Sequence, residues 1–447
     1  MTVSKKLTFL FIASVFFLQG CGALTGLNDK RPNFLIILTD DQRYDSMQYM
    51  PQTQSVIFDQ GATFSHGFIT TPLCCPSRSS ILTGMYAHNH GVTDNTYELH
   101  KETFFELMHT NGYYTGLVGK YLNSWNGDPR PEFDSWVSYK FGETRYYNPL
   151  LNVNGKWERH QGEYVTYTLG NYAMDFLGKA ANQSKPFVLL LAVNAPHDPV
   201  TPAIEDKDMK LELPPRLPSF NEVDVSDKPA WVGIKNGAGM DEASIKTLDE
   251  FRRDQILTLI ALDRTLGKVL AKLKETGEMD NTMIIFLSDN GTHWGEHRMT
   301  DKNTLYEESI RVPFAIRYPP LIAKPYVENK VVANIDIAPT LLDLAQIPIP
   351  KDMNGLSMVN LLKHQGDWRE GVLIEGWPPR GAYTAIHTEQ YIYGETVGDD
   401  TAPTTDPQLE LYDLKSDPFE MENIAYNPKY QDLVTHLKSL LTKEKSR

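Results

Sequence analysis

The sequence predicts an α/β protein in which helices cover both faces of one large mixed β-sheet, with a smaller α+β subdomain at the C-terminus. Continuous apolar runs of strand length alternate with longer amphipathic segments, which is the pattern of a sheet covered on both faces. The apolar runs end in acids, amides or a histidine. From about residue 366 the pattern changes to short alternating strands and a closing helix.

Three apolar runs are expected to be buried central strands, because each is short and almost uniformly apolar: residues 33–39, 186–193 and 282–288. Amphipathic helices are predicted over residues 164–178 and 241–276, where apolar residues recur with helical spacing. The remaining predicted elements are a surface loop, a set of short strands and a closing helix, over residues 196–229, 371–394 and 431–443.

The N-terminus has the features of an export signal. Two lysines precede an apolar run, residues 7–18, that is too short to span a bilayer. The following Leu-Gln-Gly-Cys resembles a bacterial lipobox, which predicts an exported lipoprotein anchored to the membrane through a lipid on Cys21; a plain secretory signal is the alternative. Because residue 22 is glycine rather than aspartate, we expect the outer membrane. The predicted parts are a signal peptide, a tether, a large domain and a C-terminal subdomain, over residues 1–20, 21–32, 33–365 and 366–447.

The composition excludes several classes of protein. With 41% hydrophobic and 22% charged residues, the chain of 447 residues is neither disordered nor membrane-spanning. The net charge of −14 argues against nucleic acid as a partner, because a surface that follows phosphates is basic. An anionic substrate would therefore need a local basic pocket. The chain has 3 cysteines and no disulfide framework, so its stability must come from the core.

Chemically reactive residues follow the three predicted strands. Asp40 and Asp41 follow the first, His197 lies just past the second, and Asp289 and Asn290 follow the third. The carboxyl ends of strands in open α/β sheets gather ligand sites, so we expect one active site there. Adjacent carboxylates repel one another, and these oxygen donors suit a hard cation, Ca²⁺ or Mg²⁺, rather than zinc. Taken singly, Asp-Asp and Asp-Asn-Gly are also common turn sequences.

A second reactive segment runs from Leu73 to Gly84. It places two thiols, Cys74 and Cys75, beside a proline that can open a helix, with Arg78 in the first turn. The positive end of a helix holds anionic groups well. For the thiols alone, a buried cysteine pair before an ordinary helix is the alternative interpretation.

The pattern Cys-x-Pro-Ser-Arg-x-x-x-Leu-Thr-Gly that begins at Cys74 is similar to the signature of the type I sulfatases. This resemblance implies an alkaline-phosphatase-like fold and a sulfatase catalytic domain over residues 33–365. It also implies that Cys74 is oxidised to formylglycine (3-oxoalanine) by a formylglycine-generating or radical maturase, with Cys75 in a variable position. In that family the hydrated aldehyde attacks sulfur, and its second hydroxyl then expels sulfate.

The resemblance also implies roles for residues of this sequence. Arg78 would hold the formylglycine hydroxyl, Asp289 would accept its proton, and His197 would protonate the leaving sugar oxygen. Lys120 and Lys302 match the family's sulfate-binding lysines, whereas a lone lysine is normally a solvated surface charge. The positions that match the family's calcium ligands, with Mg²⁺ as the alternative ion, are Asp40, Asp41, Cys74, Asp289 and Asn290.

Motifs over most of the chain resemble the N-acetylglucosamine-6-sulfatase branch, which implies a 6-O-sulfated N-acetylglucosamine as substrate. Many arylsulfatases have a histidine where this chain has Leu122, which leaves the base of the second half-reaction open, with His90 and Asn123 as neighbours to consider. The motifs that carry this resemblance include residues 152–156, 276–282, 305–313 and 411–414. Candidate sugar contacts, for which loop packing is an equal alternative, are His88, His90, Asp94, Asn95 and His293.

Other functions stay open on the sequence alone. A bacterial surface sulfatase could instead act on algal polysaccharides of the ulvan or carrageenan type. The same fold supports phosphate or phosphonate ester hydrolases, although the chain lacks the ligands for two zinc ions that phosphatases of this fold usually have. A non-catalytic glycan-binding lipoprotein would be expected to have lost metal or nucleophile positions, and the sequence shows no such loss.

Overall fold

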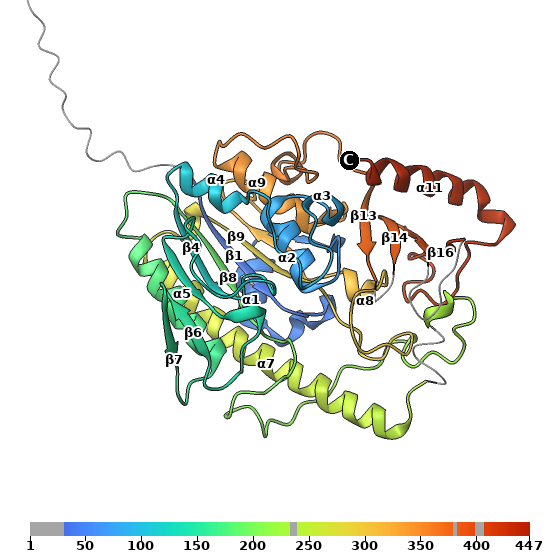
Figure 1. Ribbon diagram of the computed structural model, residues 1–447, viewed down its shortest axis with the longest axis horizontal. Coiled ribbons are helices and arrows are strands. Elements are labelled where there is room, and N and C mark those ends of the chain that lie inside the picture. The colour runs from blue at the N-terminus through green and yellow to red at the C-terminus, as the bar shows by residue number, and fades with distance from the viewer. Residues whose placement is uncertain (1–30, 233–238, 379–381, 398–405) are drawn as a thin grey trace, which may run out of the picture.

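A mixed sheet of ten strands forms the centre of the molecule (Figure 1). The computed structural model describes residues 31–447 except 233–238, 379–381 and 398–405. The expected signal peptide and Cys21 lie outside the described residues. In order across the sheet, the strands are β11 (Tyr326–Glu328), β2 (Ala62–Phe64), β10 (Ala315–Arg317), β9 (Thr282–Ser288), β1 (Asn33–Thr39), β8 (Phe187–Ala192), β4 (Tyr114–Gly119), β5 (Ser135–Ser138), β6 (Leu150–Val153) and β7 (Lys156–Arg159).

The three predicted central strands lie side by side, and their ends coincide. β1 pairs in parallel with β8 on one side and with β9 on the other. The register places Leu38 opposite Ala192 and Thr39 opposite Ser288. β4 lies parallel to β8, with Gly119 opposite Ala192. Residues that follow these four strands therefore emerge at one edge of the sheet.

Helices cover both faces of the sheet (Figure 1). Successive side chains of β1 point to opposite faces: Phe34 and Ile36 pack on the side of α2, α4 and α9, whereas Leu35 and Ile37 pack on the side of α5 and α7. All four side chains are fully buried, and each contributes about 1.5–3 kcal/mol. The α-helices are α1 (Pro51–Thr53), α2 (Cys74–Thr83), α3 (Ala87–His90), α4 (Phe104–Thr110), α5 (Val165–Ala180), α7 (Glu242–Glu275), α8 (Glu307–Ile310), α9 (Ile337–Leu344), α10 (Val359–Leu362) and α11 (Gln431–Lys445). Short 3₁₀ or π turns cover Tyr44–Tyr49, Gln54–Phe58, Lys140–Gly142, Met279–Asn281, Asn334–Asp336 and Pro428–Tyr430.

The long helix α7 serves both the core and the surface. Its start is capped by Asp241, whose side chain accepts a hydrogen bond from the backbone N–H of Ser244 at 2.8 Å. The later turns bury apolar residues such as Leu262 and Leu266 against the sheet and α5. In the first turns, by contrast, Ser244 and Thr247 are exposed. This end of α7 is therefore available to line a site.

A second sheet forms the C-terminal subdomain. It is antiparallel, and α11 packs on it through a shared apolar core. The predicted fold class is confirmed: a large mixed sheet between helices, followed by a small antiparallel sheet. Within the described part of the chain, no helix combines the length and the apolar character needed to cross a membrane. The remaining strands are β3 (Gly67–Phe68) with β12 (Val332–Ala333), and β13 (Gly371–Gly376), β14 (Tyr383–Thr388), β15 (Tyr391–Thr396) and β16 (Gln408–Asp413).

Candidate active site

Cys74 is the first residue of α2 and lies beside the residues that follow β1. Its side chain is buried, and its Sγ lies 3.1 Å from Lys302 Nζ and 3.6 Å from Asp40 Oδ1. The helix begins at Cys74 rather than at Pro76. The proline is tolerated there because the first four N–H groups of a helix have no intrahelical acceptor. Gly84 then ends the helix in the left-handed conformation, with φ 68°.

Acidic and amide side chains from the ends of β1 and β9 meet in the interior. The backbone N–H of Asp41 donates to Asp289 Oδ1 at 3.3 Å, and Asn290 Nδ2 donates to Asp41 Oδ1 at 2.6 Å. Asp40 lies beside them, and all four side chains are buried. The structure thus brings together the predicted metal ligands from two strand ends that are far apart in the sequence.

Arg78 and Lys120 neutralise two of the buried carboxylates. Arg78 donates from Nε to Asp289 Oδ2 at 2.7 Å and from Nη2 to Asp40 Oδ2 at 3.3 Å. Lys120, which follows β4, donates to Asp40 Oδ2 at 2.6 Å. Burial alone would raise the pKa of Asp40, but Lys120 and the other cations around it hold that pKa well below its usual range. Burial and the charge of Asp40 raise the pKa of Asp289 to about 6.

Two loops bring a lysine and a histidine to the same place. Lys302, in the loop between β9 and α8, forms an ion pair with Asp41 as well as contacting Cys74. His197 follows β8, and its Nε2 lies 3.8 Å from Asp41 Oδ2. Of the two, Lys302 is buried, whereas the His197 side chain is 25% exposed. Both side chains line the pocket described below, and His197 is the more exposed of the two.

The arrangement fits a divalent cation. Asn290 Oδ1 is buried and has no hydrogen-bond partner in the described structure. Asp40, Asp41, Cys74 and His197 each offer an atom that could ligate a metal, and these atoms lie within 4.8 Å of one another. Carboxylate and amide oxygens are the ligands that Ca²⁺ and Mg²⁺ prefer. The oxygen donors, which are those of Asp40, Asp41, Asp289 and Asn290, therefore agree with the predicted hard cation.

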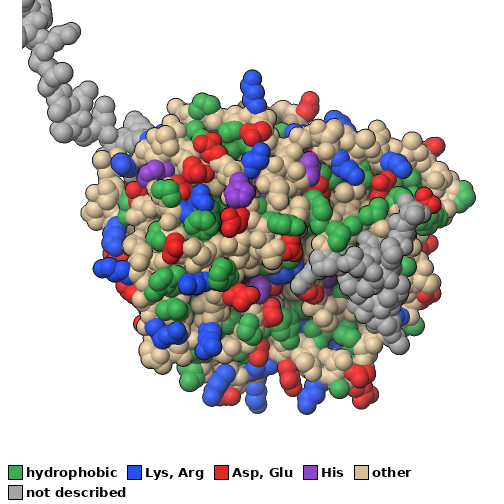
Figure 2. All heavy atoms as spheres, viewed as in Figure 1, with side chains coloured by type: hydrophobic (Ala, Val, Ile, Leu, Met, Phe, Trp, Pro, Cys, Tyr) green, Lys and Arg blue, Asp and Glu red, His purple; other side chains and the backbone are tan. Residues whose placement is uncertain are grey.

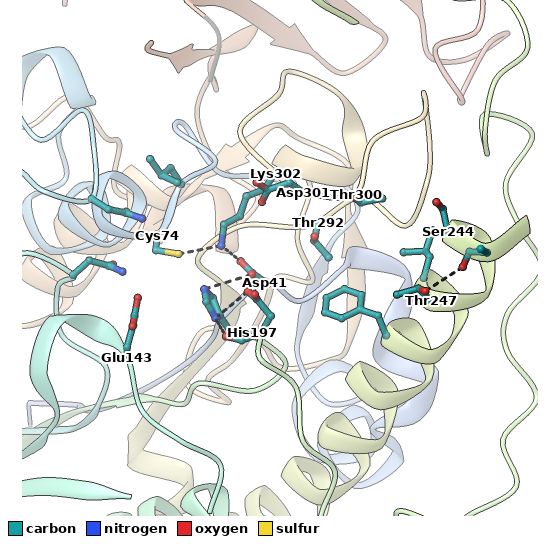
Figure 3. Close-up of a pocket in the computed structure, with 17 residues that line it drawn as sticks. Asp41, Cys74, Glu143, His197, Ser244, Thr247, Thr292, Thr300, Asp301 and Lys302 are labelled. Atoms are coloured by element: carbon teal, nitrogen blue, oxygen red, sulfur yellow. Dashed lines mark hydrogen bonds and ion pairs between the residues drawn. The ribbon is translucent and has the colours of Figure 1, made fainter. Parts of the chain in front are cut away.

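This cluster forms one side of a pocket of about 860 Å³ (Figure 3). Cys74, Asp41 and Lys302 lie together on that side. Ser244 and Thr247, from the first turns of α7, lie on the opposite side. Small-molecule sites range from about 300 to 1,000 Å³, so the pocket has room for a sugar in addition to a small anion.

Among the predicted sugar contacts, Asn95 lines the pocket. Its Oδ1 also accepts a hydrogen bond from the backbone N–H of Cys75 at 2.9 Å. Asp94 is not among the lining residues, because its Oδ1 closes a local turn by accepting from the N–H and the hydroxyl of Thr96 at 3.1 and 2.9 Å. Two adjacent residues of one loop thus have different roles.

The structure does not bring the three predicted histidine contacts to the pocket wall. His88 lies against the C-terminal sheet, with its Nδ1 2.8 Å from Glu375 Oε1. His90 is buried on α3, and burial lowers its pKa to about 3. His293 is also buried, with its Nε2 2.8 Å from Thr304 Oγ1. Local packing accounts for the orientation of each ring.

Of the two neighbours considered for the second half-reaction, Asn123 lines the pocket and His90 does not. Other lining residues were not predicted from the sequence. Asp198 and Asp301 also line it, and their positions next to predicted site residues were a usable signal. Glu143 lines it too, but no motif or strand end marked this residue.

Known proteins are similar to this chain in sequence. The family model described as Sulfatase matches residues 32–347, and the one described as N-sulphoglucosamine sulphohydrolase, C-terminal, matches residues 295–447. The human N-acetylglucosamine-6-sulfatase is 36% identical, over 80% of this chain and 70% of that protein. An N-acetylglucosamine-6-O-sulfatase of Bacteroides thetaiotaomicron is 28% identical, over 98% of this chain and 90% of that protein.

Known proteins also share the fold. A solved structure described as a complex with its substrate, D-glucosamine-2-N,6-O-disulfate, matches with a TM-score of 0.79 at 26% identity, over 93% of this chain and 98% of that chain. The chain spans 53% and 33% of the lengths of the extracellular sulfatase homologues of Caenorhabditis elegans and Drosophila melanogaster that it also matches. Because the Sulfatase model covers residues 32–347 of 447, the chain belongs to the sulfatase family.

Proposed function

We propose that the protein is a sulfatase that removes sulfate from a sulfated sugar, with 6-O-sulfated N-acetylglucosamine or a related glucosamine 6-sulfate as substrate. The observation that carries this proposal is the group of cations beside Cys74: Lys302 lines the pocket with its Nζ 3.1 Å from Cys74 Sγ, and Arg78 and Lys120 are buried against Asp40, whose Oδ1 lies 3.6 Å from that sulfur. The net charge is −14, and Figure 2 shows acidic and basic side chains interspersed over the face drawn. The cations beside Cys74 must therefore supply the positive charge that attracts a sulfate.

The choice of sugar rests on the relatives. The human and bacterial relatives are named for N-acetylglucosamine 6-sulfate, and the solved neighbour was described with a 6-O-sulfated glucosamine. In the proposed reaction Cys74 acts after oxidation to formylglycine by a maturase, and its Sγ marks the position of the modified group. A divalent cation, which we propose to be Ca²⁺, would polarise the reacting oxygens. The residues that would hold it are Asp40, Asp41, Asp289 and Asn290.

The side chains around Cys74 have distinct roles in this mechanism. Lys120 and Lys302 stabilise negative charge on the sulfate oxygens, and Asp289 accepts the proton of the nucleophile. His197 donates a proton to the leaving sugar oxygen. Burial disfavours its charged ring, but Asp40 and Asp41 raise the pKa of His197 to about 10, which favours the protonated ring. A bound dication would lower this value by opposing the charge of the carboxylates.

Hydrolysis of a matched substrate panel tests the proposed function. The matured protein is assayed for release of inorganic sulfate from N-acetylglucosamine 6-sulfate, glucosamine-2-N,6-O-disulfate, and ulvan and carrageenan oligosaccharides. Phosphate and phosphonate monoesters are assayed in parallel. We expect the highest kcat/KM on a 6-sulfated glucosamine. A higher value on an algal oligosaccharide would overturn the choice of sugar, and a higher value on a phosphonate would overturn the sulfatase assignment.

Gly142 leaves room for the side chain of Lys120, because it has no Cβ. It has φ 68°, and a Cβ there would lie 2.8 Å from Lys120 Cε and 3.0 Å from Asn123 Cγ. We predict that Gly142→Ala displaces the ammonium and lowers kcat about tenfold, since catalytic geometry is sensitive to small shifts. The control is Gly162→Ala, where φ is 80° but no atom lies within 4 Å of the added Cβ. If both variants lose stability and activity equally, backbone strain rather than Lys120 explains the effect.

A further inference from the structure

A second group of buried, potentially metal-binding side chains lies outside the proposed active site. His297 belongs to the loop between β9 and α8, Glu308 belongs to α8, and Glu420 follows β16 in the C-terminal subdomain. Their exposed fractions are 0%, 2% and 0%. One atom of each side chain lies within 4.8 Å of the corresponding atoms of the other two. Three separate segments of the chain thus converge on one buried position.

The converging atoms have no hydrogen-bond partners. In the described structure, His297 Nε2, Glu308 Oε2 and Glu420 Oε1 are all buried and unpartnered. Buried polar atoms are otherwise nearly always hydrogen-bonded, so three such atoms in one place indicate a missing ligand. Electrostatics point the same way, because two carboxylates buried without a cation are costly.

In two of the three side chains, the atom that does not face the cluster has a hydrogen-bond partner. His297 Nδ1 lies 2.7 Å from Glu222 Oε2, so a proton on Nδ1 would be held by this carboxylate and Nε2 would be left as the nitrogen free to ligate. A carboxylate behind a histidine is the usual support of a metal-bound imidazole. Glu420 Oε2 accepts from the backbone N–H of Glu307 at 3.0 Å, which leaves its Oε1 as the oxygen without a partner. The ligands are therefore oriented before anything binds.

Two neighbouring acids have cationic partners of their own. Their cations are therefore already engaged and do not neutralise the two carboxylates of the cluster. Glu296 pairs with Arg43 at 3.2 Å, and Glu222 pairs with Lys228 at 3.1 Å. Glu308 Oε2 lies 4.0 Å from His293 Nδ1, and this nitrogen also has no hydrogen-bond partner in the described structure. A bound cation would therefore neutralise the negative charge of the Glu308 and Glu420 carboxylates.

We propose that His297, Glu308 and Glu420 bind a structural zinc ion, with His293 or a water molecule as the fourth ligand. A set of imidazole nitrogen and carboxylate oxygen suits zinc, whereas calcium and magnesium prefer oxygen alone. Closing the site requires only that the three atoms, now within 4.8 Å, move to about 2.0–2.2 Å from a common centre. The proposal does not depend on the substrate or on sulfatase activity.

A bound zinc would tie the loop that carries Lys302 to the C-terminal subdomain. His297 and Lys302 belong to the same loop, whereas Glu420 lies beyond the second sheet. The competing arrangement is a proton shared by the carboxylates, and burial together with Glu296 does raise the pKa of Glu308 to about 8. The two arrangements respond oppositely to an isosteric amide, because glutamine imitates a protonated carboxyl group but is a poor zinc ligand.

The test is metal content and thermal stability of the full chain, equilibrated with buffered zinc and then freed of loose metal. We expect about one tightly held zinc per chain and a higher Tm than after chelation. In crystals, anomalous scattering at the zinc edge should place the ion at His297 rather than at Cys74. A wild-type chain without tightly held zinc, or with zinc only at Cys74, would overturn the proposal.

A matched pair of variants completes the experiment. Glu420→Gln should weaken zinc binding at least about tenfold and remove the zinc-dependent rise in Tm. The control is Glu410→Gln, because Glu410 is also buried but accepts from the hydroxyls of Tyr306 and Tyr412 at 2.8 and 2.9 Å instead of joining the cluster. It should keep its zinc. A Glu420→Gln chain that binds zinc like the wild type, or that is stabilised while binding none, would contradict the proposed site.

Discussion

Replacing Cys74 with alanine is expected to lower kcat/KM for sulfate-ester hydrolysis by at least about 10³-fold, because it removes the group from which the nucleophile is made. Alanine favours helix and keeps the start of α2 intact, so the variant should remain folded. Mass spectrometry of the wild-type peptide should show a loss of about 18 Da at Cys74, the change from thiol to aldehyde at an activated cysteine. Initial rates and peptide masses are measured on the same preparations.

Cys75 is the natural control for this experiment. It is the adjacent residue and equally buried, but its Sγ lies 3.7 Å from Ser124 Oγ rather than among the site residues. Cys75→Ala should keep kcat within about threefold and lose about 1 kcal/mol of stability from a small cavity. Full activity of wild-type protein with unmodified Cys74, or modification of Cys75 instead, would refute the proposed nucleophile.

Replacing Lys302 with methionine should lower kcat by about 10²- to 10³-fold, the usual loss when one group that stabilises transition-state charge is removed. Lys302 is buried, pairs with Asp41 and lies 3.1 Å from Cys74 Sγ. Methionine preserves the unbranched apolar stem, so the packing around it should change little. The measurement is kcat and KM on the best sulfated sugar of the panel.

Cation affinity distinguishes loss of charge stabilisation from general disruption of the site. Lys302 and a bound cation compete for Asp41, so Lys302→Met should bind Ca²⁺ at least as tightly as the wild type in calorimetry. Lys324→Met, at an exposed position, is the control for removing a lysine and should behave as the wild type. Weaker Ca²⁺ binding in Lys302→Met would show that the lysine maintains the structure of the cation site. It would contradict the proposed role of Lys302 in stabilising charge on the sulfate.

The convergence of the acidic residues could be predicted because it follows from strand geometry. Uniformly apolar runs identified β1, β8 and β9 as central strands, and parallel pairing then brought their carboxyl ends to one edge. Thr39 lies opposite Ser288, so Asp40 and Asp289 follow paired positions. The hydrophobic pattern of the strands was therefore sufficient to predict the residues of the site that follow the sheet.

The loops and the far wall of the pocket could not be predicted in this way. Lys302 belongs to a loop without a periodic pattern, and only its motif context indicated that it is a site residue. The first turns of α7 continue a helix whose apolar spacing reports core packing, so nothing marked Ser244 and Thr247 as lining residues. His88 and His90 are close to Cys74 in sequence, but neither lines the pocket: His88 contacts Glu375 and His90 is buried on α3.

The central position of β1 has a consequence for how the chain folds. The partners of this strand begin at Phe187 and Thr282, so its two edges are completed by segments synthesised much later. Such high contact order slows folding, because long loops must close before their contacts form. An early apolar strand with two open edges is also a hazard for aggregation until β9 has been made. Productive folding of this protein should therefore be largely post-translational and should benefit from a chaperone that shields residues 33–39.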